Sequence, residues 1–255
     1  MDFFRGIAIL DMILVHFSGF MPPLISKIVD YTDFAMEGFV LVAGYMVGRK
    51  YYHDFASRWK QVVWKLYSRA LQLYAIHAVM VLTINVPLFY LLYDERRTGQ
   101  FGAFLLNSLL LLNQIGLMHI LPAFIPLYLV SPLILYFSRR HGTWVLIFSF
   151  ALFGIGNFHP YLLDLGEKTI FPFILWQVYF VAGCFMGIRS LDPGKGKAVH
   201  PNTRFSLAAL FMAIMMILKH FKIIDPSMIS KFPLNFPGLL YGVSIPAFLY
   251  TFILR

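Results

Sequence analysis

Residues 2–16 read D-F-F-R-G-I-A-I-L-D-M-I-L-V-H and open an apolar stretch that covers residues 3–20. A helix needs about 20 predominantly apolar residues to cross the hydrocarbon core of a bilayer. The stretch therefore predicts a first membrane span. Two basic residues, Arg5 and His16, lie within it.

The composition of the whole chain is typical of a membrane protein. Of 255 residues, 59% are hydrophobic and 13% are charged, and the mean hydropathy of +0.72 lies outside the usual range of soluble domains. A formal net charge of +9 can indicate a nucleic-acid-binding protein. Here the Lys and Arg residues fall between apolar stretches, where the positive-inside rule expects them. We therefore expect a protein of the lipid bilayer that does not bind nucleic acid.

Further apolar stretches recur along the chain. Seven of them predict a span each: 34–48, 66–92, 121–138, 143–158, 170–188, 204–220 and 237–254. A ninth candidate, residues 101–118, is apolar but carries Asn107, Asn113 and Gln114. We expect an all-α fold, a polytopic integral membrane helical bundle with eight or nine spans.

The basic residues predict the orientation of this bundle. Six of them crowd the connection after the second stretch: Arg49, Lys50, Arg58, Lys60, Lys65 and Arg69. The positive-inside rule places that connection, and with it the N-terminus, in the cytoplasm. Later basic connections also fall inside if residues 101–118 do not cross. We therefore expect a short re-entrant or buried segment there, covered by protein.

Residues 50–65 mix aromatic and basic side chains, as segments along the cytoplasmic membrane interface do. We prefer an ordinary anchor there, although a basic surface would also suit a polyanionic nucleotide such as coenzyme A. Trp176 and Gln177 are interpreted as part of an interfacial belt. The single cysteine, Cys184, excludes a disulfide within one chain and is expected to be a packed thiol.

Arg5 and His16 are eleven residues apart, about three helical turns, so both lie on one face and about 16 Å apart along the axis. Ionisable residues inside a span are functional candidates. A cation near the cytoplasmic end can hold an anionic ligand, and a histidine deeper in the span can take and return a proton near neutral pH. An alternative of equal weight is that Arg5 reaches the interface and His16 caps the far end of the span.

Further polar residues lie in the neighbouring spans. Glu37 could orient the His16 ring as an acidic partner orients a catalytic histidine, or could lie in water at the interface. Three glycines of the same span, Gly38, Gly44 and Gly48, would let another helix approach closely.

The third span carries Arg69 and His77, which lie within about 80° of each other on the helix, and Asn85 follows eight residues later. Asn113 and Gln114 belong to a polar stretch that could line a cavity, and we place them among the candidate substrate-binding residues. The eight histidines are scattered without Cys, Asp or Glu at ligand spacing, so no metal site is predicted.

The first span resembles the opening span of the type-3 membrane acyltransferases, whose signature is an Arg, ten residues and a His. Four later segments resemble, in order, the OpgC branch, which is linked to succinylation of osmoregulated periplasmic glucans: M-E-G-F-V-L-V-A-G-Y-M-V-G, R-A-L-Q-L-Y-A-I-H, L-L-L-N-Q and P-F-I-L-W-Q-V-Y-F-V-A-G. The matches run from residue 2 to about residue 188.

This resemblance implies an O-acyltransferase of the bacterial inner membrane. His16 would be the catalytic base with Glu37 beside it, Arg5 would lie on the donor side, and Arg69 and His77 would be further site residues. Acyl-CoA, as succinyl-CoA or acetyl-CoA, would be the co-substrate, with no bound cofactor, and a glucan or polysaccharide would be the acceptor. Residues 1–255 would form a single membrane acyltransferase domain, truncated at its C-terminus.

Two other functions stay open at this point. A transporter or flippase could use the same buried Arg, Glu and His residues, and inverted repeats would favour it, although none is found. A protein without catalytic activity could instead scaffold a glucan-synthesis complex.

Overall fold

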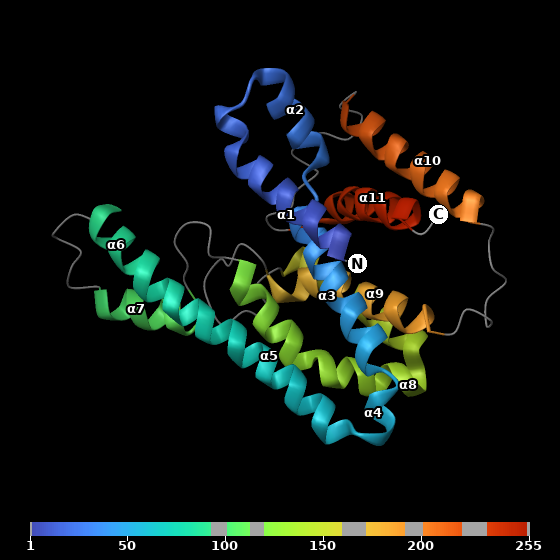
Figure 1. Ribbon diagram of the computed structural model, residues 1–255, viewed down its shortest axis with the longest axis horizontal. Helices are drawn as coiled ribbons and strands as arrows, with labels where there is room; N and C mark the ends of the chain where they lie inside the picture. Colours follow the sequence, from blue (N-terminus) through green and yellow to red (C-terminus); the bar gives the residue numbers. More distant parts are fainter. Residues whose placement is uncertain are drawn as a thin grey trace. The chain divides into compact units, whose positions relative to one another are not determined.

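The computed structural model describes residues 2–92, 101–112, 120–159, 172–191, 201–220 and 234–253. These residues form helices and contain no β-strand, which confirms the all-α prediction (Figure 1). In chain order the elements are α1 (Asp2–Phe17), η1 (Ser18–Phe20), α2 (Pro23–Thr32), α3 (Ala35–Tyr51), α4 (Asp54–Ser57), α5 (Trp59–Met80), η2 (Val81–Asn85), α6 (Val86–Leu92), α7 (Phe101–Leu109), α8 (Ile120–Phe158), α9 (Phe173–Arg189), α10 (Pro201–His220) and α11 (Phe236–Ile253).

The chain divides into two compact units. Unit 1 consists of Met1–Arg49 and Ala182–Arg255, and unit 2 consists of Lys50–Val181. The boundary near residue 181 falls inside α9, so the first half of this helix belongs to unit 2 and the second half to unit 1.

Two helical stretches in the described part are long and apolar enough to cross a membrane, Trp59–Leu91 and Leu121–Phe158. The second contains two predicted spans, 121–138 and 143–158. The two helices meet at a kink at His141, which lies in the predicted connection and has non-helical backbone angles of φ −141° and ψ 49°. Two stretches are fewer than the eight or nine spans expected, so the number of spans stays a prediction.

The remaining apolar helices are shorter. Four apolar helical segments of 10–17 residues are found in the described part: Gly6–Phe20, Phe173–Arg189, Ser206–His220 and Pro237–Leu249. Helix α7 has nine residues and is about 14 Å long, too short to cross a hydrocarbon core of about 30 Å. Residues 113–119 lie outside the described part, so the re-entrant segment predicted over 101–118 also stays a prediction.

The core of unit 1 joins α1, α3 and α11. Ala8 of α1 packs with Phe34 and Val42 of the α3 region and with Ile245 of α11, and all four side chains are buried. Helix α3 is buried along most of its length, with eleven buried residues distributed around it. A helix that is apolar on every side belongs in a protein interior, so α3 is the central helix of this unit.

The second half of α9 packs directly against α3. A Cβ atom added to Gly183 would overlap the main-chain carbonyl of Leu41, and one added to Gly187 would overlap that of Tyr45. On the other helix, a Cβ added to Gly48 would overlap the carbonyl of Cys184. The prediction that Gly48 allows a close helix approach is therefore confirmed.

Unit 2 is built on α5, which packs along α8. Ser149 of α8 and Gln177 of the first half of α9 form a buried pair: the Ser149 hydroxyl donates to Gln177 Oε1 at 2.6 Å, and Gln177 Nε2 donates to the Ser149 carbonyl at 2.8 Å. Trp176 and Gln177 are 1% and 4% exposed. The predicted interfacial belt is therefore wrong, because both side chains lie in the helix-packed interior.

Candidate functional site

Helix α1 carries the first candidate group. It runs without a break from Asp2 to Phe17, so Arg5 and His16 share one helix as predicted. His16 lies in its last turn and is exposed. The side chain of Arg5 lies outside the part that the structure describes. The exposed imidazole is accessible to a substrate, which the proposed role as a base requires.

Asp11 has a role that the sequence did not indicate. Its carboxylate is buried, and Oδ2 accepts a hydrogen bond of 2.9 Å from the backbone N–H of Phe34, the residue that precedes α3. The first N–H groups of a helix have no partner within the helix, and a negative charge there interacts favourably with the helix dipole. Asp11 therefore fixes α1 to the beginning of α3. An acidic residue inside an apolar stretch is a functional or structural candidate. Its partner could not be identified from the sequence, because Phe34 is 23 residues away.

Glu37 lies in the first turn of α3 and is fully buried. A carboxylate at this position is also favoured by the helix dipole. Glu37 thus lies three residues after Phe34, the residue that Asp11 holds at the beginning of α3. The predicted pairing of Glu37 with His16 stays a prediction.

Arg69 and His77 lie on α5 in different environments. Arg69 is exposed, and its Nη1 donates a long hydrogen bond of 3.4 Å to Gln72 Oε1. His77 is fully buried, and its Nε2 lies 3.0 Å from the carbonyl oxygen of Ser108 on α7. The helix therefore presents one cation outward and one imidazole inward. The other two predicted binding residues, Asn113 and Gln114, lie outside the described residues.

A second polar residue is buried two turns beyond His77. Asn85 ends the π-helical segment Val81–Asn85 and is fully buried. Neither amide atom of Asn85 has a hydrogen-bond partner among the described residues, and neither does His77 Nδ1. Buried polar atoms are costly unless they are satisfied, and π-helical turns occur frequently at functional sites. This part of unit 2 can therefore accept hydrogen bonds from, or donate them to, a polar group of a ligand.

Comparison with known proteins finds a family whose model covers all of these residues. A family model described as "OpgC protein" matches residues 1–244. No curated protein and no solved structure matches the chain. The matched range runs through both units and contains every candidate residue named above.

Proposed function

The chain belongs to the OpgC family, and from this premise we propose that it is a membrane-embedded O-acyltransferase. The family in general indicates a glucan-modifying acyltransferase. The enzyme moves an acyl group, which we take to be succinyl, from cytoplasmic acyl-CoA to a hydroxyl of a periplasmic or cell-envelope glucan. The family match over residues 1–244 is the observation that carries this proposal.

His16 is the general base in this proposal. It takes the proton of the glucan hydroxyl as that oxygen attacks the thioester carbonyl and forms the new ester bond. The carbon–sulfur bond breaks, and the coenzyme A thiolate leaves and receives the proton from His16. The exposed position of His16 at the end of α1 supports this role, because both substrates must reach the imidazole.

Arg5 binds the donor. One helix carries both residues, and the helical rise separates them by about 16 Å along the axis. Arg5 holds negative groups of acyl-CoA towards the cytoplasm, while the acyl end extends to His16. The hydrogen bond from the Phe34 N–H to Asp11 supports this placement of the donor along α1, because it fixes α1 to the beginning of α3.

Further roles are proposed for Glu37 of unit 1 and for polar residues of unit 2, each considered within its own unit. Glu37 orients the imidazole of His16. Arg69, His77, Asn113 and Gln114 bind substrate, with Arg69 as a cation for the donor and the other three for polar groups. The buried positions of His77 and Asn85 support a polar environment in unit 2.

The proposed setting is the bacterial inner membrane, with several spans, a cytoplasmic N-terminus and contact with a glucan-synthesis complex. The basic residues 49–69 and the two apolar helices of membrane-crossing length support it. In this orientation the donor arrives from the cytoplasm and the acceptor from the opposite side.

The test uses purified protein in proteoliposomes with succinyl-CoA labelled in the succinyl group and a glucan acceptor. We expect label to become ester-linked to the glucan and to be released by mild base. Transport of an intact solute across the vesicle membrane, without ester formation, would overturn the acyltransferase and support a transporter.

A further inference from the structure

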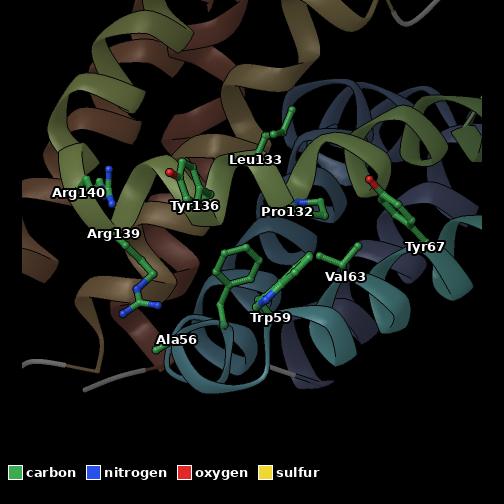
Figure 2. A pocket seen from close by; sticks show the side chains of 10 residues that line it. Ala56, Trp59, Val63, Tyr67, Pro132, Leu133, Tyr136, Arg139 and Arg140 are labelled. Atoms are coloured by element: carbon green, nitrogen blue, oxygen red, sulfur yellow. The ribbon is translucent and has the colours of Figure 1, made fainter.

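Unit 2 contains a groove that none of the proposed catalytic or binding residues described by the structure lines. It has a volume of about 740 Å³ and lies between the α4–α5 segment and α8 (Figure 2). Trp59, Val63 and Tyr67 form one wall; they are spaced by four residues, so they follow one face of α5. Eight residues of helix make this wall about 12 Å long.

The groove has one cationic end. Arg139 and Arg140 lie at one end in Figure 2, and Tyr67 lies at the other. Both arginines are exposed and directly precede the helix break at His141. The Arg140 guanidinium lies 5.7 Å from the ring centre of Tyr136, another lining residue. No carboxylate is found among the described residues that line the groove, so these two positive charges attract an anion.

The remainder of the groove is apolar and opens outward. Trp59, Leu133 and Tyr136 are 54%, 57% and 45% exposed. They belong to the two helical stretches that are long and apolar enough to cross a membrane, or lie at the end of one. Exposed apolar side chains on such helices face lipid chains, and Trp beside basic residues is typical of the membrane interface. A ligand can therefore enter this groove from the bilayer.

We propose that the groove is a binding site for an anionic glycerophospholipid. Its phosphate binds Arg139 and Arg140, and the first part of one acyl chain lies between Val63 and Leu133. Basic pockets between membrane helices on the cytoplasmic side bind lipid headgroups of this class.

The apolar wall distinguishes this ligand from the acyl-CoA donor. The pantetheine arm of coenzyme A carries amide and hydroxyl groups along its length, and buried polar groups need hydrogen-bond partners. Between the arginines and the far end, the described lining side chains offer three such partners, the Trp59 indole N–H and the hydroxyls of Tyr67 and Tyr136. An acyl chain needs none. The lipid site is independent of the proposed acyl transfer.

The test measures lipid retained by the full chain after purification from nanodiscs that contain phosphatidylglycerol or phosphatidylcholine. We expect the wild type to retain phosphatidylglycerol and not phosphatidylcholine. The double variant Arg139→Gln/Arg140→Gln should bind phosphatidylglycerol about 25-fold more weakly, about fivefold for each cation lost. The control Arg189→Gln, which removes an exposed arginine from the last turn of α9, should bind as the wild type does.

A second variant distinguishes lipid binding inside the groove from general electrostatic attraction of an anionic lipid to the two arginines. Val63→Trp fills the apolar part and leaves both arginines in place, and it should also lose the lipid. Equal retention of the two lipids by the wild type would overturn the proposal, as would equal weakening by Arg189→Gln and the double variant. Displacement of phosphatidylglycerol by acyl-CoA in direct competition would assign the groove to the donor and overturn the lipid site.

Discussion

The contact between α3 and the second half of α9 predicts an unusual effect for Gly183→Ala. Alanine is normally the better residue inside a helix, by about 0.5–1 kcal/mol. At Gly183 the added methyl group would overlap the main-chain carbonyl of Leu41. The substitution should therefore lower the free energy of unfolding.

The size of the effect follows from what must move. Overpacking a close contact costs about 1–3 kcal/mol. Here the obstacle is main chain, with the backbone of Tyr45 also close, so no side chain can rotate away. The cost belongs in the upper half of that range. After the gain in helix propensity is subtracted, we expect a net loss of about 1–2.5 kcal/mol.

The assay is reversible unfolding in mixed micelles, with Gly154→Ala as the matched control. Gly154 also lies inside a helix, but among the described residues an added Cβ would have no contact within 4 Å beyond its chain neighbours and the adjacent backbone of its own helix. It should stabilise the protein by up to about 1 kcal/mol. The two substitutions are chemically identical and should have opposite signs. A Gly183→Ala protein as stable as the Gly154→Ala protein would refute the close packing of α3 on α9.

Two further predictions concern buried hydrogen bonds, each measured by the same unfolding assay. Asp11→Asn keeps the shape but removes the charge that accepts the Phe34 N–H, and should cost about 1–2 kcal/mol, while the exposed Asp54→Asn should change stability by less than about 0.5 kcal/mol. Gln177→Leu leaves two groups of Ser149 without their partner and should cost about 1–3 kcal/mol. An unchanged free energy of unfolding in either variant would contradict the corresponding contact.

The positions of the helices could be predicted from sequence because apolar length is the dominant signal in a chain of this composition. The stretch 34–48 corresponds to Ala35–Tyr51, and 237–254 corresponds to Phe236–Ile253. Helix α2 was not predicted, since its ten residues are much shorter than a membrane span and begin with Pro23. The break predicted between 121–138 and 143–158 is confirmed, because α8 is divided at His141 by non-helical backbone angles.

The site was predictable only where a single helix decides the geometry. The common helix of Arg5 and His16 follows from their spacing. The bond from Phe34 to Asp11 joins residues from different helices, and periodicity within one helix carries no information about which partner an acid finds. Burial of Gln177 follows from its bonds to Ser149, which likewise depend on how two helices pack.

The role of His16 is the central claim. It is tested most directly by measuring label transfer from succinyl-CoA to glucan with wild type, His16→Ala and the control His53→Ala, which removes another exposed histidine. Loss of a general base should reduce the transfer rate about 10²–10⁴-fold in His16→Ala, and His53→Ala should transfer at the wild-type rate. Equal transfer by His16→Ala and wild type would contradict the mechanism.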